Sequence, residues 1–353
     1  MKGLILCGGK GTRMRPFSYT GVKHFLPVAN KPVICYIIES MKRAGIKEIY
    51  IVTGAADGEF RYKLGDGGRW GVSITYIVQH RPLGLANGVK ISKEYLSGDA
   101  FVTVLGDNLI AHSVEDILRI HNDTGADSTI LLSPVECPER FGIATLENGK
   151  ITKLVEKPKK PASNYAVIGM YVFNGKIFDA IEKIKPSARG EYELTDAIME
   201  MIRGGDMVGY KLTGDWWIDV GRPEDLLEAN KRMLGDIQRD IGGQMDLNSK
   251  IADKVIIGEN SVIADSIIDD CVVIGKNVVV QKSHIGPYTA IGDGSRLTGI
   301  RIKNSIVMED CVLDGVFSGI DMSIIGRGST IKISGQQKNI SIWVGQDSTI
   351  KGV

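Results

Sequence analysis

A regular repeat in the C-terminal third restricts the fold of this chain more than any other feature. Apolar residues that begin a two-residue motif recur every 17 positions, at Ile257, Ile274, Ile291, Met308 and Ile325. Within each interval aliphatic residues return every five or six positions. Such a period predicts stacked turns of three short strands, a parallel β-helix of hexapeptide repeats. The equal intervals argue against an irregular β-sandwich, and Val344–Gly345, two residues out of register, predicts an atypical last coil.

The preceding part of the chain has a different pattern. Residues 1 to about 228 alternate between apolar runs typical of strands and amphipathic stretches typical of helices. This alternation predicts an α/β fold with a mostly parallel sheet, and Asn148–Gly149 between two apolar stretches predicts a β-hairpin. Residues 235–250 lose the periodicity. We therefore expect one domain over residues 1–234, a linker over 235–250 and the β-helix over 251–353.

The predicted elements of the first domain can be given by their residues. Strands are predicted at Gly3–Cys7, Glu48–Val52, Ile74–Val78, Phe101–Leu105, Asp127–Leu132, Ala166–Phe173 and Trp216–Asp219. Helices are predicted from Pro32, over Gly84–Leu96, Ile177–Ile184 and Leu194–Ile202, and from Pro223.

Charge and cysteine content exclude some classes of function. The 353 residues carry a net charge of +1, which gives no support for binding to nucleic acid or to a membrane surface. The five cysteines form no CxxC pair, which is typical of a reducing compartment. No signal peptide or long apolar run is visible, so we expect a cytoplasmic protein.

The first predicted strand, Gly3–Cys7, runs directly into a glycine loop. Three glycines follow, at Gly8, Gly9 and Gly11, and then Arg13 and Arg15. Glycine lets backbone N–H groups approach an anion closely, and the arginines add fixed positive charge. The spacing fits neither a P-loop, because no Gly-Lys-Ser/Thr occurs, nor a dinucleotide fingerprint, because Met14 replaces the third glycine. An ordinary strand-to-loop turn is the alternative.

The same stretch, Leu6 to Pro16, together with Lys23 and Leu26 to Pro32, resembles the signature of the sugar-1-phosphate nucleotidyltransferases. Within that family the chain is most similar to the long-form glucose-1-phosphate thymidylyltransferases. The resemblance implies a Rossmann-like mixed, mostly parallel sheet followed by a left-handed β-helix. It also implies Mg²⁺-dependent transfer of a nucleotidyl group from dTTP to glucose 1-phosphate, with dTDP-glucose and pyrophosphate as products.

The resemblance also implies roles for charged residues. All reacting groups in this chemistry are anions, so the protein needs carboxylates for Mg²⁺ and cations for phosphates. Asp107 and Asp219 match the metal ligands of the family, and Arg13, Lys157 and Asp107 match its catalytic residues. The alternative for each aspartate alone is a helix cap or a turn residue, but the metal role is favoured for Asp107 because Gly106 leaves room beside it.

The nucleotide site implied by the family includes the glycine loop and two later segments. Gln79 is expected to read the base, because an amide can pair with a donor and an acceptor on a pyrimidine. Gly84 is expected to begin a helix with free N–H groups. The nucleotide-binding residues are expected to be Leu6, Gly8, Gly9, Gly11, Thr12, Arg13, Lys23, Gln79, Pro82 and Gly84.

The sugar-phosphate site is expected further along the chain, at Gly142, Glu156, Lys157, Val167, Tyr171 and Arg189. Lys157 is expected to hold the phosphate, because Glu156–Lys157–Pro158 matches the family motif as a unit. For Val167 the alternative is a core residue, and for Arg189 an exposed loop arginine. Phe141 stands where many members of the family have tyrosine, which could alter the sugar preference.

Other functions remain open at this point. A UTP-dependent uridylyltransferase acting on glucose or N-acetylglucosamine 1-phosphate fits the same motifs, and a non-catalytic nucleotide-sugar-binding subunit would keep the fold. Acyl transfer by the β-helix would have to use His284, its one histidine, although a coil-corner residue is the simpler interpretation. We expect the partners to be a nucleoside triphosphate, a sugar 1-phosphate and further copies of the chain bound through the β-helix.

Overall fold

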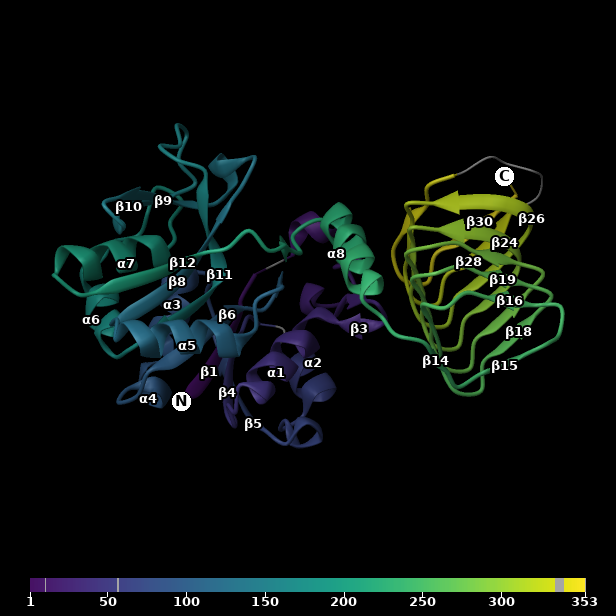
Figure 1. Ribbon diagram of the computed structural model, residues 1–353, viewed down its shortest axis with the longest axis horizontal. Helices are drawn as coiled ribbons and strands as arrows, with labels where there is room; N and C mark the ends of the chain where they lie inside the picture. Colours follow the sequence, from purple (N-terminus) through teal and green to yellow (C-terminus); the bar gives the residue numbers. More distant parts are fainter. Residues whose placement is uncertain (10, 56, 334–339, 353) are drawn as a thin grey trace. The chain divides into compact units, whose positions relative to one another are not determined.

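The computed structural model describes residues 1–9, 11–55, 57–333 and 340–352 (Figure 1). The chain divides into two compact units. The first unit consists of Met1–Lys10 and Ile34–Asp219, and the second unit consists of Gly11–Val33 and Val220–Val353. A short N-terminal segment therefore belongs with the C-terminal part of the chain, which the sequence pattern does not predict.

The first unit is built on a nine-stranded mixed sheet with the order β10-β9-β11-β6-β1-β4-β5, in which β8 pairs with β11 and β12 with β8. Its central strands are parallel, and β11 runs antiparallel to β6 and β8. The predicted Rossmann-like α/β class is confirmed. The strands are β1 (Lys2–Cys7), β4 (Glu48–Thr53), β5 (Ser73–Val78), β6 (Phe101–Leu105), β8 (Ser128–Pro134), β9 (Gly142–Glu147), β10 (Lys150–Glu156), β11 (Tyr165–Phe173) and β12 (Val208–Leu212).

The predicted hairpin is present between β9 and β10. Its two turn residues have positive φ angles, 50° at Asn148 and 73° at Gly149. Asparagine and glycine tolerate this conformation best, so the turn follows from local chemistry. The hairpin ends at Glu156, at the start of the predicted sugar-phosphate motif.

Helices cover the sheet and bury its aliphatic side chains. One core cluster joins Leu4 and Leu6 of β1 and Phe173 of β11 with residues of α3, α6 and α7. The α-helices of the chain are α1 (Val33–Arg43), α2 (Asp57–Leu64), α3 (Leu85–Ile91), α4 (Lys93–Leu96), α5 (Val114–Thr124), α6 (Lys176–Lys183), α7 (Leu194–Arg203) and α8 (Pro223–Gly235). Short 3₁₀ turns occur at η1 (Thr12–Met14), η2 (Lys23–Phe25), η3 (Gly68–Trp70) and η4 (Pro138–Arg140).

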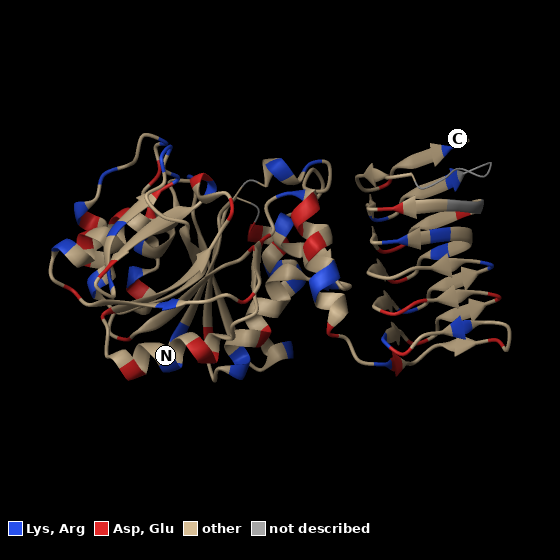
Figure 2. Cartoon of the chain, turned by 45° about the horizontal axis from the view of Figure 1, so that its top comes forward, with Lys and Arg blue, Asp and Glu red and all other residues tan. Residues whose placement is uncertain are grey.

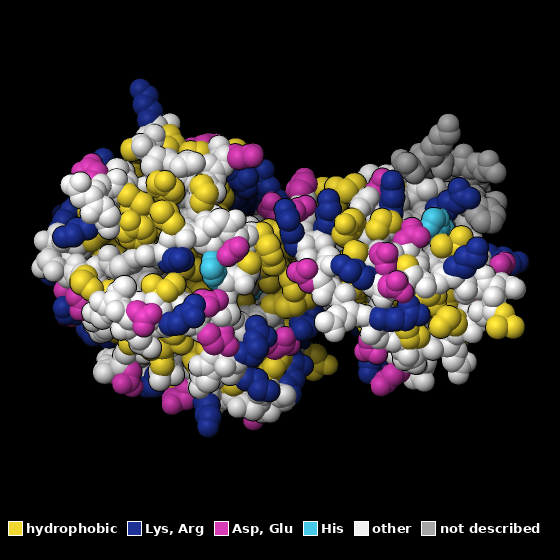
Figure 3. Space-filling model, viewed as in Figure 1, with side chains coloured by type: hydrophobic (Ala, Val, Ile, Leu, Met, Phe, Trp, Pro, Cys, Tyr) yellow, Lys and Arg dark blue, Asp and Glu magenta, His cyan; other side chains and the backbone are white. Residues whose placement is uncertain are grey.

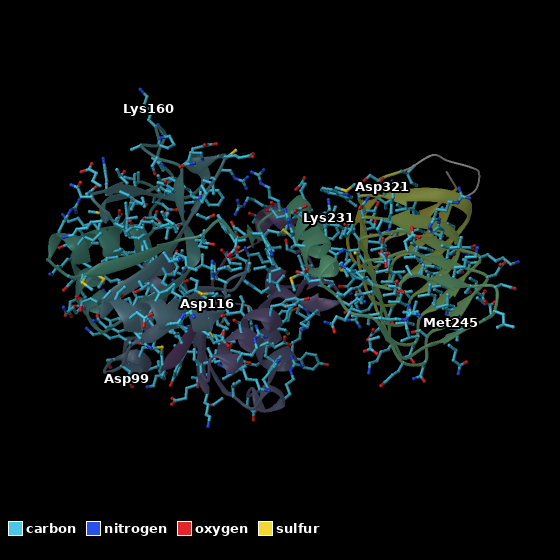
Figure 4. The ribbon with its side chains drawn as sticks, in the orientation of Figure 1. Asp99, Asp116, Lys160, Lys231, Met245 and Asp321 are labelled. Atoms are coloured by element: carbon cyan, nitrogen blue, oxygen red, sulfur yellow. The ribbon has the colours of Figure 1, made fainter. Side chains whose placement is uncertain are left out.

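Several elements differ from the prediction. The helix expected over Gly84–Leu96 is interrupted at Ser92, and α2, α5 and β12 were not predicted. Helix α5 does carry a sequence signal, because the Ser113 side chain caps its N-terminus and the Asp116 carboxylate accepts from the Ser113 backbone N–H. Asp116, labelled in Figure 4, lies on the first turn of this helix.

In the second unit the repeat forms a parallel β-helix, as predicted. Strands of successive coils lie side by side in three columns (Figure 1). The first column is β14 (Asp240–Ile241), β17 (Val255–Ile257), β20 (Val272–Ile274), β23 (Thr289–Ile291), β25 (Ile306–Val307), β27 (Ile324–Ile325) and β29 (Trp343–Val344). The others contain β15 (Gln244–Met245), β16 (Lys250–Ile251), β18 (Val262–Ala264), β19 (Ile267–Ile268), β21 (Val279–Gln281), β22 (His284–Ile285), β24 (Arg296–Lys303), β26 (Val312–Asp321), β28 (Thr330–Ile333) and β30 (Thr349–Lys351).

The register of the coils corrects one detail of the repeat. Ile257, Ile274 and Ile291 stack at the predicted interval of 17 residues. The next partner of Ile291 is Val307 rather than Met308, and Ile325 pairs with Val344 in the last coil. The aliphatic side chains of this column are buried because they point into the β-helix.

Two further findings concern the ends of the β-helix and the surface. Strands β14 and β15 pair with β17 and β18, although they lie within residues 235–250, and the domain boundaries at 234 and 251 stay a prediction. Acidic and basic residues are interspersed along both units (Figures 2 and 3). No described helix is long and apolar enough to cross a membrane.

Candidate active site

The glycine loop begins where the central strand β1 ends. A Cβ atom at Gly8 would lie 2.6 Å from Oε1 of Gln79, which is 8% exposed. The Nε2 atom of Gln79 donates to the carbonyl oxygen of Gly84, 3.2 Å away. The structure therefore brings together three of the residues predicted to bind the nucleotide. Of the others in this unit, Leu6 is buried in β1, whereas Gly9 and Pro82 are exposed.

Gly84 lies against the backbone of Tyr192, a contact that the sequence does not predict. The N–H of Tyr192 donates to the carbonyl oxygen of Leu83 at 2.7 Å, and the carbonyl oxygen of Tyr192 accepts from the N–H of Ala86 at 3.1 Å. Gly84 has a φ of 98°. At the start of α3 the N–H of Ala86 thus has a protein partner, in contrast to the free donor that we expected.

The two predicted metal ligands lie at one end of a two-stranded ribbon: Asp107 directly precedes β7 (Asn108–Ile110), and Asp219 is the last residue of β13 (Trp217–Asp219). The strands pair antiparallel, and Asp219 lies opposite Asn108, the residue after Asp107. Asn108 is 3% exposed, and its Nδ2 donates to Oδ1 of Asp107 at 2.9 Å. A Cβ atom at Gly169 would lie 2.5 Å from Oδ1 of Asn108, so any residue other than glycine at position 169 would displace the Asn108 amide.

The donor set of this ribbon can be tested against a magnesium ion. Mg²⁺ prefers oxygen ligands and usually takes one or two protein carboxylates, the rest being water and substrate phosphates. Asp107 and Asp219 supply two carboxylates at neighbouring backbone positions. Among the residues that the structure describes, no group of three or more His, Cys, Asp or Glu side chains could hold a metal ion. Two carboxylates, completed by water and phosphate oxygens, are a donor set that fits a magnesium ion.

Glu156 is at the centre of the predicted sugar-phosphate site. Its Oε2 lies 3.4 Å from Oγ1 of Thr195 and 3.0 Å from the position of a Cβ atom at Gly142. Its Oε1 lies 3.6 Å from Nζ of Lys157, whose side chain is 44% exposed. Gly142, Glu156 and Lys157 are therefore adjacent. Thr195, on α7, was missed because nothing in the helix pattern distinguishes it.

Arg189 is surrounded by carboxylates. Its guanidinium lies 2.6 Å from Glu191, 3.4 Å from Glu156 and 3.8 Å from Glu193. Burial lowers the pKa of the guanidinium, but the three glutamates raise it by more, so this pKa lies above its usual value. A phosphate at Arg189 would thus compete with these carboxylates, a restriction that the sequence does not reveal.

Val167 and Tyr171 of β11 are mainly core residues. Val167 is 8% exposed, and its Cβ lies 3.9 Å from the position of a Cβ atom at Gly142. Tyr171 is 5% exposed and stacks on Phe173 with 5.6 Å between the ring centroids. Burial, and secondarily the negative charge of Glu156, raise the pKa of Tyr171 well above its usual value. Tyr171 is therefore a buried, neutral phenol.

An aromatic contact connects the sugar-phosphate residues with the aspartate ribbon. The ring of Phe141, which precedes Gly142, packs edge-to-face on Trp217 with 5.2 Å between centroids. Trp217 is two residues before Asp219 on the same strand. The predicted metal and sugar-phosphate residues of the first unit thus form one connected group.

The remaining predicted residues belong to the second unit. Gly11 has a φ of 63° and begins η1, where its carbonyl oxygen accepts from Oγ of Ser18 at 2.7 Å. Thr12 and Arg13 are exposed on this turn, whereas Lys23 on η2 is 9% exposed. Of the two predicted phosphate-binding cations in this unit, Arg13 is therefore exposed and Lys23 is buried.

Comparisons with known proteins identify the family. Residues 2–235 match the Nucleotidyl transferase family. The low-salt glycan biosynthesis nucleotidyltransferase Agl11 of Haloferax volcanii is 43% identical over 335 residues, covering 94% of each chain. The glucose-1-phosphate thymidylyltransferase of Streptomyces antibioticus is 39% identical over 329 residues, covering 93% of this chain and 92% of the relative.

A solved structure is similar to about two thirds of the chain. It is the crystal structure of a Bacillus anthracis protein assigned as a glucose-1-phosphate thymidylyltransferase, in complex with sucrose. The two proteins are 37% identical, with a TM-score of 0.62. The match covers 68% of this chain and 98% of the other.

Proposed function

We propose that this chain, which belongs to the nucleotidyl transferase family and is a nucleotidyltransferase, transfers a deoxythymidylyl group from dTTP to glucose 1-phosphate. The proposal follows the sequence motifs and the relative from Streptomyces antibioticus, a glucose-1-phosphate thymidylyltransferase. The observation that carries it is the pairing that puts Asp219 opposite Asn108, directly beside Asp107. Two carboxylates from distant parts of the sequence then lie next to a group of sugar-phosphate residues.

The reaction needs no base from the protein. A phosphate oxygen of glucose 1-phosphate attacks the α-phosphorus of dTTP, the bond between that phosphorus and the bridging oxygen breaks, and pyrophosphate leaves with the electron pair. Because the nucleophile is already anionic, the work of the protein is positioning and charge neutralisation.

In this proposal magnesium would bind at the end of the ribbon formed by β7 and β13. Bound Mg²⁺ neutralises phosphate charge and orients the triphosphate. Asp107 and Asp219 would be its protein ligands. Asn108 would fix the orientation of Asp107 through the hydrogen bond of 2.9 Å between the two side chains.

The cations would bind the phosphates. Lys157 would hold the sugar phosphate beside Glu156, which would accept hydrogen bonds from sugar hydroxyls. Arg13 would stabilise charge at the α-phosphorus and on pyrophosphate, and Lys23 would bind on the nucleotide side. Gln79 would read the base with the amide atoms that its contacts to Gly8 and Gly84 hold in place.

The test combines substrate comparison with one pair of variants. Initial rates with dTTP and UTP, each with glucose, mannose and N-acetylglucosamine 1-phosphate, would identify the substrates. Asp107→Asn should lower kcat by at least about a hundredfold while the circular dichroism spectrum stays unchanged. Asp99→Asn is the matched control, since Asp99 is exposed at the opposite end of the same strand β6 (Figure 4).

Two results would contradict the proposal. Full activity of Asp107→Asn would remove the metal assignment. A preference for UTP over dTTP with the same sugar 1-phosphate would instead identify the chain as a uridylyltransferase of the family.

A further inference from the structure

The segment Gly11–Val33 is the part of the molecule whose place the proposed function does not explain. It contains Arg13 and Lys23, yet it lies in one compact unit with helix α8 and the β-helix. Its contacts with these elements are specific. They join the nucleotide-binding part of the sequence to coils that begin more than two hundred residues later.

The first contact is made by the turn between β2 (Pro27–Val28) and β3 (Lys31–Pro32). Asn30, at this turn, has a φ of 61°, and its Nδ2 donates to the carbonyl oxygen of Ile291 at 2.6 Å. Ile291 is the last residue of β23, and the same carbonyl accepts from the N–H of Gly275 in the preceding coil. The turn is thus bonded to a rigid position in the stacked coils.

The second contact is a buried asparagine on α8. Asn230 is completely buried, and both ends of its amide are used. Its Oδ1 accepts from the N–H of Ala29 at 2.9 Å, and its Nδ2 donates to the carbonyl oxygen of Tyr288 at 3.1 Å. A buried amide that loses a partner is costly, so this side chain holds the two backbone segments at one separation.

Apolar packing supports the same arrangement. Leu234 of α8 forms a small core with Val273 and Ala290 of the β-helix, and Ala29 packs against it. Lys231, next to Asn230, places its Nζ 5.3 Å from the centre of the Tyr288 ring (Figure 4). The helix, the N-terminal turn and the coils therefore share one interface.

The third contact lies closer to Arg13. A Cβ atom at Gly345, in the last coil, would lie 3.3 Å from the carbonyl oxygen of Pro16 and 3.4 Å from its Cβ. Pro16 is three residues after Arg13. The segment is thus in contact with the β-helix on both sides of Lys23, at Pro16 and at Asn30.

We infer that the β-helix is a positioning scaffold for the nucleotide-binding segment, with Asn30, Asn230 and Gly345 as its positioning residues. The inference rests on the proposed function for the roles of Arg13 and Lys23. It assigns to the β-helix a part in triphosphate binding that is separate from any assembly of chains.

The test uses two matched asparagines. Asn30→Gly removes the amide donor and keeps a residue suited to positive φ. Asn304→Gly does the same within the β-helix, since Asn304 has a φ of 48° and donates to Asp321 at 2.8 Å. We expect kcat/KM for dTTP to fall about three- to tenfold in Asn30→Gly. KM for glucose 1-phosphate should stay within about twofold, and Asn304→Gly should match the wild type in both.

A second pair of variants and a second readout complete the test. Gly345→Ala presses on Pro16, whereas Gly235→Ala meets open space, so only the first should lower kcat/KM for dTTP. Amide hydrogen exchange over residues 11–26 should rise in Asn30→Gly and Gly345→Ala but not in the controls, whether or not the protein uses dTTP.

The outcomes separate the two proposals. A wild type without thymidylyl transfer would overturn the proposed function, while faster exchange in the two test variants would still support the scaffold. Exchange and kcat/KM equal to those of the control variants would overturn the scaffold.

Discussion

Replacing Gly84 by alanine tests the contact between the predicted base-binding loop and Tyr192. Gly84 has a φ of 98°, and an added Cβ atom would lie 2.5 Å from the carbonyl oxygen and 2.8 Å from the nitrogen of Tyr192. Because both are backbone atoms, no side-chain rotation can relieve the overlap. Gly98 is a matched control, since its φ is 107° and nothing lies within 4 Å of an added Cβ atom.

The expected effect has two parts. Both substitutions force alanine into a conformation that costs about 1–3 kcal/mol in stability. Only Gly84→Ala also displaces Tyr192 and its two hydrogen bonds, to Leu83 and Ala86. At about 1 kcal/mol for each bond, the extra loss is about 2 kcal/mol, or about 4–8 °C in Tm for a unit of this size.

Thermal unfolding of the two variants, followed by circular dichroism, measures this difference. Initial rates over a range of dTTP concentrations then report on the loop, and kcat/KM should fall in Gly84→Ala alone. Equal Tm values and equal kcat/KM values in the two variants would refute the reasoning, because the contact with Tyr192 would then contribute nothing.

Two further predictions concern other positions in the first unit. Gly169→Ala should displace Asn108, whose Oδ1 lies 2.5 Å from the added Cβ atom. Because Asn108 donates to Asp107, this displacement should lower kcat. Gly175→Ala is the control, since its added Cβ atom has no neighbour within 4 Å, and equal kcat values in the two variants would contradict the prediction. Burial lowers the pKa of His121, so the folded protein disfavours its protonation, and stability should decrease as pH falls below about 6.5. Tm measured between pH 7.5 and 5.5 should decrease less in His121→Gln, and identical slopes would contradict the assignment.

Local sequence chemistry predicted much of the fold. The Asn148–Gly149 turn, strand β1 before the glycine loop and the coils stacked through Ile257 follow from residue type and spacing alone. Each of these features depends on residues that are neighbours in sequence or on a motif that recurs several times along the chain. The interruption of the helix at Ser92 and the pairing of Ile291 with Val307 were not predicted.

The candidate site was less predictable from the same information. The family motifs supplied Asp107 and Asp219, which are 112 positions apart, but no local pattern predicts that β7 and β13 pair. Of the carboxylates around Arg189, Glu191 and Glu193 are near it in sequence, but Glu156 lies 33 residues earlier and is brought there only by the fold. Asn230 was invisible for the same reason, because its two backbone partners are separated by hundreds of residues.

At three glycines of the candidate site, the protein itself uses the space that a Cβ atom would fill. At Gly8, Gly142 and Gly169 that space is occupied by a polar side chain of the protein, whose oxygen lies 2.5–3.0 Å from the position of an added Cβ. Each glycine thus lets a functional amide or carboxylate lie directly on the backbone, where its freedom to rotate is small. In this reaction the main contribution of the protein is positioning. An alanine at any of the three positions should therefore lower kcat/KM more than it lowers the stability of the fold.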